Sequence, residues 1–287
     1  MKSYRDIPGD GGSGIAEQVA ERRAAQERSL AEVRHLVAVG SGKGGVGKST
    51  LTALLAAALR AAGRTVAILD ADLNGPSQAR LAGLRSAPLV PGPDGLELPR
   101  TPSGIGVASV GSLVPEPAAV ELDAPAGGDS HLWRVSREFT FLAQLLGAVR
   151  WGRLDFLLVD LPPGAERSVQ HAEQIGPRGS FLLVTIPSDL ARGVVARSLS
   201  ALRKTPNRVV GYAENMAGYS CAGCGTVQPL FPGVPGVELD LPRLASIPFD
   251  PAVAAAADRG AASATGPTAR AVEALAARLA AELEGGR

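Results

Sequence analysis

The residues of this chain whose types and spacing could do chemistry begin with one glycine- and lysine-rich loop. The loop reads Gly42, Lys43, Gly44, Gly45, Val46, Gly47, Lys48 and Ser49. A glycine, four residues and then Gly-Lys-Ser is the spacing of a phosphate-binding loop, in which glycines let backbone N–H groups face a phosphate. Lys48 would reach the outer phosphates, and the Ser49 hydroxyl would bind Mg²⁺. The pattern predicts a nucleotide site.

The elements on either side of this loop follow the order that such a site requires. Residues 36–39 are apolar and partly β-branched, which is typical of a strand, and an alanine- and leucine-rich stretch from Thr50 to residue 62 favours a helix. The N-terminus of that helix would place partial positive charge at the phosphates. A glycine-rich turn without a ligand is the alternative, and the order of strand, loop and helix speaks against it.

Acidic residues follow two other expected strands. The apolar residues 65–69 lead to Asp70 and Asp72, and the nearly continuous apolar run at 154–159 leads to Asp160. In open α/β sheets, ligands gather beyond the carboxyl ends of the strands. We therefore expect Asp160, together with Asp70 acting through water, to hold Mg²⁺, and Asp72 to orient the water that attacks the γ-phosphate. For Asp70 and Asp72, a turn shaped by Asp, Asn, Gly and Pro is the alternative.

Strand and helix patterns alternate along the rest of the chain. Residues 181–185 and 208–212 read as strands, residues 189–203 as the helix between them, and residues 267–283 as an alanine-rich helix with apolar spacing. This order predicts an α/β fold with a doubly wound, mostly parallel sheet.

Length and composition agree with a single domain. The chain has 287 residues, of which 45% are hydrophobic, enough for a substantial core. We expect one nucleotide-binding P-loop domain over residues 34–287, preceded at 1–33 by a linker and either an accessory helix or a partly disordered lead-in. Residues 80–129 are rich in Pro, Gly and Ala, and we expect them to form loops with one strand at 106–110.

The charge balance and the apolar runs bear on partners and location. With 29 basic and 28 acidic residues, the formal net charge is +1. We therefore expect no nucleic-acid partner and no membrane partner. The N-terminus carries no apolar signal core, and the apolar runs are too short to span a bilayer. A cytoplasmic protein is expected.

One amide residue bears on the choice of nucleotide. The strand that begins at residue 208 is expected to end near Asn215, whose side chain offers a donor and an acceptor to adenine. The sequence contains no Asn-Lys-x-Asp pattern for reading guanine. We therefore expect ATP rather than GTP.

The two cysteines of the chain, Cys221 and Cys224, are separated by only two residues in a loop rich in glycine and proline. Two thiolates can hold one edge of a metal site, whereas a four-iron cluster or a tetrahedral zinc ion needs four ligands. Two chains related by a two-fold axis would supply four thiolates. A redox-active dithiol, a zinc site completed by histidine, and two cysteines without special chemistry remain alternatives.

Several short stretches occur in the order found in one known family. They are residues 43–49, Asp70-Ala71-Asp72 with Gly75-Pro76-Ser77, Trp133-Arg134, Trp151-Gly152, Asp160-Leu161-Pro162-Pro163-Gly164, Glu214-Asn215-Met216, Cys221-x-x-Cys224, Ser246-Ile247-Pro248 and Asp258-Arg259-Gly260. In these stretches the chain resembles the Mrp/ApbC-type iron–sulfur cluster carrier ATPases, which belong to the MinD/ParA-like deviant P-loop NTPases. The resemblance covers about residues 33–260.

This resemblance implies an ATP-binding homodimer with slow ATPase activity. It implies that Cys221 and Cys224 of two chains hold a labile [4Fe-4S] cluster, which the dimer delivers to apoproteins. It also implies that Lys43 contacts the nucleotide of the opposing subunit, for which a solvated loop lysine is the alternative. The implied catalytic residues are Lys43, Lys48 and Asp72. The implied nucleotide contacts are residues 42–49, Thr50 and Asn215.

Two departures from the family pattern bear on hydrolysis. Ala165-Glu166-Arg167 stands where the family usually has Thr-Gly-Asp, and Val135-Ser136 stands where it has Gly-Pro. Both lie where nucleotide state is expected to be coupled to the dimer, so a protein that uses ATP only as a structural clamp is one alternative.

Two other classes of function are also alternatives to a cluster carrier. One is a MinD/ParA-like positioning ATPase, which would not need the cysteines. The other is a reductase resembling the nitrogenase iron protein.

Overall fold

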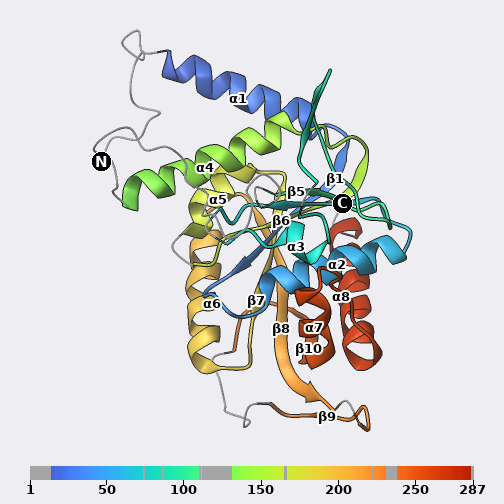
Figure 1. Ribbon diagram of the computed structural model, residues 1–287. Helices are drawn as coiled ribbons and strands as arrows, with labels where there is room; N and C mark the ends of the chain where they lie inside the picture. Colours follow the sequence, from blue (N-terminus) through green and yellow to red (C-terminus); the bar gives the residue numbers. More distant parts are fainter. Residues whose placement is uncertain are drawn as a thin grey trace.

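The computed structural model describes residues 14–73, 75–85, 87–109, 111, 131–164, 167–221, 223–230 and 238–285. Its central sheet contains the strands β1 (Val33–Ser41), β2 (Val66–Asp70), β5 (Gly106–Ala108), β6 (Leu154–Asp160), β7 (Gly179–Thr185), β8 (Arg208–Ser220) and β10 (Arg243–Phe249). These strands are parallel and lie in the order β10-β8-β7-β1-β6-β2-β5. The expected doubly wound, mostly parallel sheet is confirmed (Figure 1).

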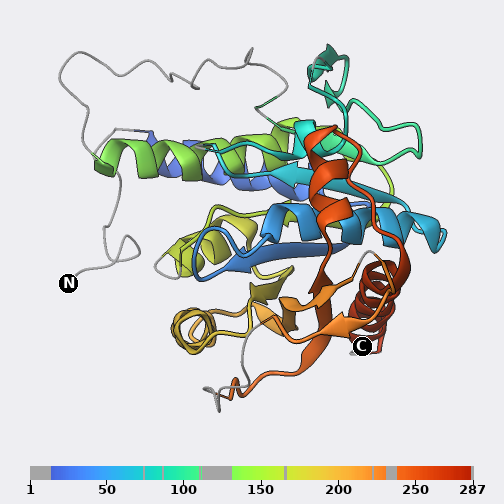
Figure 2. The ribbon, with the colours of Figure 1, turned by 60° about the horizontal axis from the view of Figure 1, so that its bottom comes forward.

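Helices cover both faces of this sheet. On one face lie α2 (Lys48–Ala61), α7 (Pro251–Asp258) and α8 (Gly266–Glu284). On the other lie α4 (His131–Ala148), α5 (Ser168–Ile175) and α6 (Asp189–Leu202). The short helix α3 (Gln78–Leu81) follows β2. The fold therefore consists of three layers, with the sheet in the middle (Figure 2).

The strand residues explain why both faces carry a core. Successive side chains of a strand point to opposite faces. In β1, Val37 and Val39 pack with the α2 and α8 layer, whereas Leu36 and Ala38 pack with the α4 and α6 layer. Because strands of this kind are buried on both faces, they read as continuous apolar runs, and for this reason they could be found in the sequence.

The helix α1 (Ile15–Ser29) lies along α4 (Figure 1). The crossing depends on Gly147, because a Cβ atom there would meet Ala25 and the Gln26 backbone at 3.3–3.5 Å. Residues 17–23 of α1 remain exposed. Among the residues that the structure describes, no helix is both long enough and apolar enough to cross a membrane.

The strands differ from the expectation in two places, one in the central sheet and one in a separate two-stranded sheet. The strand expected to end near residues 214–216 continues as β8 to Ser220, because β10 pairs with it as far as Tyr219 and β9 (Val227–Gln228) pairs antiparallel with its last residues. Such pairing overrides the weak strand propensity of the local sequence. Within residues 80–129, β3 (Val90–Gly92) and β4 (Gly95–Glu97) form a hairpin that the pattern did not indicate, and the strand expected at 106–110 is β5.

Candidate nucleotide site and cysteine hairpin

The glycine- and lysine-rich loop connects the carboxyl end of β1 to the start of α2. Gly47 has φ 77° and precedes the first helical residue, Lys48. No side chain caps this helix start, so its first N–H groups face outward without a side-chain acceptor. Gly42 packs against Val194 of α6 so closely that a Cβ atom would overlap that side chain. The backbone therefore has the form of a phosphate cradle.

Lys48 forms a buried ion pair with Asp160, which ends β6 next to β1. The lysine is 6% exposed, and the carboxylate is fully buried. Thr52 stands one helical turn after Lys48, and its hydroxyl donates to the Lys48 carbonyl at 2.9 Å and to Asp160 Oδ1 at 3.5 Å. The lysine also lies 3.3 Å from the Ser49 hydroxyl. Residues predicted from two separate stretches, Lys48 with Ser49 and Asp160, thus meet at one point.

Asp70 ends β2, directly beside Asp160 in the strand register. Its Oδ2 accepts hydrogen bonds from the Ser77 and Gln78 N–H groups and from the Ser109 hydroxyl, each at 2.9 Å, and Oδ1 accepts from the Asp72 N–H at 3.3 Å. Burial, followed by repulsion from Asp160, raises its pKa to about 7. With its oxygens occupied in this way, Asp70 chiefly shapes the loop that follows β2.

Gln78 is a residue of this site that the sequence analysis did not single out. It is fully buried, and its Nε2 donates to Asp160 Oδ2 at 2.8 Å and to the Ser49 carbonyl at 2.9 Å. The only signal was its place directly after the Asp70 to Ser77 stretch. For Thr52, the signal was its spacing of four residues from Lys48, which places both on one helix face.

Asp72 and Lys43 lie at the more open side of the site. Asp72 is partly exposed, and its Oδ1 accepts from the Gly75 N–H at 3.1 Å. The Lys43 carbonyl accepts from the Ser41 hydroxyl at 3.0 Å. Within the described part of the chain, the Lys43 ammonium has no hydrogen bond or ion pair. Thr50 lies in the first turn of α2 and is half-buried.

Asn215 comes to the same site from β8. Its Nδ2 donates to the Val46 carbonyl at 2.9 Å, and a Cβ atom on Gly47 would overlap this amide. The next residue, Met216, has φ 54°, a backbone conformation that side chains other than glycine rarely adopt. Asn215 thus lies against the P-loop. This position suits a residue that contacts the base of a bound nucleotide, and equally one that holds the loop in place.

A buried carboxylate anchors β8 just before Asn215. Glu214 is 3% exposed, and its two oxygens contact Arg192 of α6 at 2.7 Å and Arg243 of β10 at 3.1 Å. The hydrogen bond from Arg192 to Glu214 raises the pKa of Arg192. A buried ion pair of this kind fixes geometry more than it adds stability. The two ion pairs of Glu214 thus join α6, β8 and β10 next to Asn215.

The cysteines lie in the turn of the β8–β9 hairpin, which projects from the sheet (Figure 1 and Figure 2). The Cys221 N–H donates to the Thr226 carbonyl at 2.9 Å, and the Gly225 N–H donates to the Cys221 carbonyl at 2.8 Å. Cys224 is exposed, and its Sγ lies 2.9 Å from the Thr226 hydroxyl. This hydrogen bond is the main cause that lowers the pKa of Cys224. The exposed thiol is therefore disposed to ionise and bind metal.

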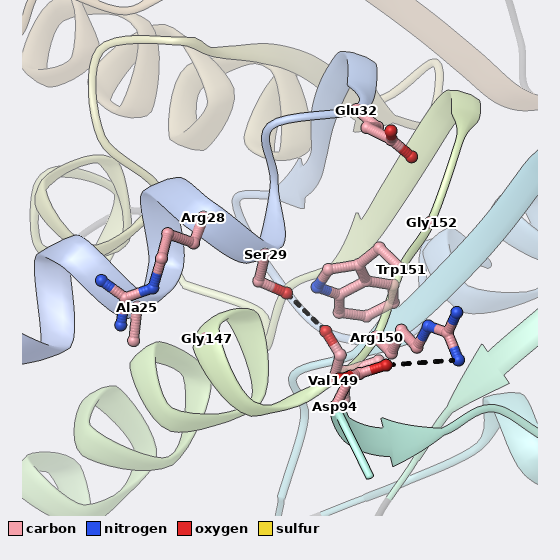
Figure 3. Close-up of a pocket in the computed structure, with 10 residues that line it drawn as sticks. All are labelled: Ala25, Arg28, Ser29, Glu32, Asp94, Gly147, Val149, Arg150, Trp151 and Gly152. Carbon is pink, nitrogen blue, oxygen red and sulfur yellow. Dashed lines mark hydrogen bonds and ion pairs between the residues drawn. The ribbon is translucent and has the colours of Figure 1, made fainter. Parts of the chain in front are cut away.

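A cavity of about 410 Å³ lies elsewhere, between α1, the end of α4 and the β3–β4 hairpin (Figure 3). Arg150 and Asp94 approach to 4.0 Å in it, and the Ser29 hydroxyl donates to the Val149 carbonyl. Glu32 and Gly152 line it just before β1 and β6 begin. The cavity is therefore at the amino edge of the sheet, opposite the phosphate cradle.

Fold and site together define a P-loop nucleotide-binding protein of the MinD/ParA-like class. Residues 32–283 match the family model described as ParA, NUBPL iron-transfer P-loop NTPase. The chain belongs to this family, whose class of activity is the hydrolysis of nucleoside triphosphates.

Similar proteins agree with this assignment. The cytosolic Fe-S cluster assembly factor NUBP2 of Homo sapiens is 38% identical over 83% of this chain and 87% of its own length. The iron-sulfur cluster carrier protein of Saccharolobus solfataricus is 33% identical over 82% and 77%. A nucleotide-binding protein of Archaeoglobus fulgidus, solved with ADP, has a TM-score of 0.71 at 31% identity and covers 86% of this chain and 95% of its own.

A likeness to MinD shows the fold alone. The septum site-determining protein MinD of Pyrococcus horikoshii, solved with Mg-ADP, has a TM-score of 0.60 at 21% identity, covering 86% of this chain and 96% of its own. The residues that distinguish cluster carriers from positioning ATPases must therefore be sought in the site itself.

Proposed function

We propose that this protein is an ATP-dependent iron–sulfur cluster carrier that works as a homodimer. The observation that carries the proposal is the pair of half-buried Cys221 and exposed Cys224, which β8 joins to a P-loop nucleotide site. Relatives that are cluster carriers and assembly factors by name match most of the chain, which supports the same cargo here. Cytosolic relatives likewise support a cytoplasmic location.

The nucleotide would bind with its phosphates at the start of α2. Lys48 would leave Asp160 for the outer phosphates, and the backbone of residues 42–49 with Thr50 would supply hydrogen-bond donors. The Ser49 hydroxyl and the Asp160 carboxylate are oxygen ligands of the kind that Mg²⁺ prefers, directly or through water. When bound, Mg²⁺ would neutralise charge on the phosphates. We assign to Asp70 the shaping of this site and, at most, a contact through water.

Hydrolysis would use Asp72 and Lys43 from the open side of the site. Asp72 would orient the water that attacks the γ-phosphate, and Lys43 of one subunit would reach the phosphates bound by the other. The free ammonium of Lys43 in the described chain supports that role, because a lysine already paired would have to give up its partner. Residues Ala165 and Glu166, which depart from the family pattern, lie outside the described residues. We propose slow turnover.

The dimer would complete the cargo site. One chain has only two cysteines, whereas a [4Fe-4S] cluster takes four thiolates. Two hairpins that meet across a two-fold axis would supply them. The exposed side chains of Val227 in β9 and of Leu230 just after it, 50% and 41% accessible, would become covered in such a contact. The cluster would then pass from this exposed position to an apoprotein.

The positioning-ATPase alternative has less support. It would leave Cys221 and Cys224 without a role, and the similar MinD structure is only 21% identical, whereas the relatives named for iron–sulfur cluster assembly and transport are 38% and 33% identical.

Anaerobic reconstitution with iron and sulfide tests the proposal. The wild-type chain should acquire about four iron and four sulfide per dimer. The Cys221→Ala/Cys224→Ala variant should acquire neither while it still binds ATP. A reconstituted wild type should then activate a cluster-requiring apoenzyme, and ATP should change the rate of that transfer. Iron content that is indifferent to both cysteines would refute the carrier function and leave the nucleotide site intact.

A further inference from the structure

The amide of Gln78 has a chemically determined orientation. Its nitrogen meets two acceptors, Asp160 Oδ2 at 2.8 Å and the Ser49 carbonyl at 2.9 Å. A reversed amide would place its oxygen against a carboxylate and a carbonyl, neither of which can donate a hydrogen bond. The oxygen, Oε1, must therefore point to the opposite side of the amide group, away from the acceptors that Nε2 meets.

That oxygen is left without a protein partner. Gln78 is 0% exposed, and Oε1 has no hydrogen bond to any residue that the structure describes. A buried acceptor of this kind is costly unless a donor reaches it. Because Oε1 and Nε2 share one carbon, the unused oxygen lies beside Ser49 and Asp160, the two residues proposed to hold Mg²⁺. A water molecule bound to Mg²⁺ is a strong donor at that place, since this ion usually keeps several waters.

We propose that Gln78 is a positioning residue for Mg²⁺. Its Nε2 fixes the Asp160 carboxylate and the backbone of Ser49, and its Oε1 accepts a hydrogen bond from a water molecule in the Mg²⁺ coordination sphere. This inference rests on the proposed nucleotide function and adds one residue to it. The same amide joins the loop after β2 to the P-loop, so Mg²⁺ binding would draw both loops together.

The test measures how strongly Mg²⁺ enhances nucleotide binding. The affinity for a fluorescent ATP analogue is determined in EDTA and again in saturating Mg²⁺, and the ratio of the two is the Mg²⁺ enhancement. Four proteins are compared: wild type, Gln78→Met, Gln78→Glu and the control Gln144→Met, which makes the same change at an exposed position of α4. Thermal melting establishes that each variant is folded.

The expected pattern separates the two ends of the amide. Gln78→Met should lose about fivefold of the enhancement, as for one hydrogen bond, and should keep its affinity in EDTA within about twofold. In Gln78→Glu, burial beside Asp160 favours the protonated acid, whose O–H replaces the donor to Asp160 and whose carbonyl oxygen remains for the water, so the enhancement should be retained. Gln144→Met should behave as wild type.

Other outcomes overturn the inference in distinguishable ways. Full enhancement in Gln78→Met, or an equal loss of affinity with and without Mg²⁺, refutes a role toward the ion. A loss of the enhancement in Gln78→Glu relative to wild type refutes the role of the oxygen, and this comparison stands even if Gln78→Met does not fold. An absence of Mg²⁺ enhancement in the wild type would instead refute the proposed nucleotide site itself.

Discussion

Lys48 at the start of α2 and Asp160 at the end of β6 neutralise each other inside the protein, where neither charge reaches solvent. The lysine proposed to bind phosphate is therefore held by the carboxylate proposed to face Mg²⁺. Phosphates and Mg²⁺ must arrive together for both charges to keep partners, since an unpaired buried charge costs far more than an exposed one. This relationship couples the two ligands.

Removal of the lysine should affect stability and binding together. Lys48→Met leaves Asp160 buried without its counter-ion, so the free energy of unfolding should fall by about 3 kcal/mol in urea titrations. The variant should also lose the rise in melting temperature that MgATP gives the wild type. Lys204→Met, at an exposed position, is the control and should keep both properties. A normal MgATP shift in Lys48→Met would contradict the site.

Replacement of Lys43, in contrast, should affect dimerisation without affecting stability. Because its ammonium has no partner within the described chain, Lys43→Met should leave the free energy of unfolding within about 0.5 kcal/mol of wild type. It should abolish dimerisation driven by a non-hydrolysable ATP analogue, measured by analytical ultracentrifugation. If Lys43→Met forms this dimer as well as wild type does, Lys43 is a solvated loop lysine and does not contact the nucleotide of the other subunit.

Cys224 should react as a thiolate at lower pH than an ordinary cysteine. The hydroxyl of Thr226 lowers the Cys224 pKa, so the ionised form, which attacks alkylating agents and binds iron, should persist as the pH falls toward neutral. Alkylation by iodoacetamide, followed by peptide mass spectrometry in the metal-free reduced protein, should give a midpoint below that of a free thiol.

The hydroxyl of Thr226 provides the matched control for this pH dependence. Thr226→Val should move the Cys224 midpoint upward, whereas Thr226→Ser keeps a hydroxyl and should leave it near wild type. Equal midpoints in the valine and serine variants would show that the hydrogen bond does not set the reactivity.

Whether a feature of the fold or the site could be predicted from the sequence depends on how far apart in the chain the interacting residues lie. The P-loop and Asp160 were predictable because strand, loop and helix are local patterns, and parallel strands bring their carboxyl ends to one edge. Gln78 was not, because a glutamine at a helix start resembles a solvated residue until the fold places it beside Asp160. The length of β8 likewise depends on β10, which follows it in the sequence.

His171 of α5 should make the protein sensitive to acid. Burial, with repulsion from Arg167 and Lys48, lowers its pKa to about 3, so the folded protein keeps it neutral while the unfolded chain binds a proton below about pH 6.5. The unfolded state therefore binds more protons between these values, and stability falls as the pH falls.

Replacement of this histidine should flatten the acid dependence. Between pH 7.5 and 4.5, the wild type should lose up to about 2.5 kcal/mol more of its unfolding free energy than His171→Leu, by urea titration. Asp70, with its raised pKa, acts in the opposite direction in both proteins and cancels in the comparison. Parallel pH curves for the two proteins would mean that His171 does not titrate as described.

The central claim is that two chains share one cluster through their cysteine hairpins. Native mass spectrometry of the anaerobically reconstituted protein tests it most directly, because it weighs the assembly and its cargo together. We predict a species of two chains with one [4Fe-4S] cluster, absent from Cys221→Ala/Cys224→Ala. A cluster carried by a single chain, or wild-type dimers that never carry iron, would contradict the claim.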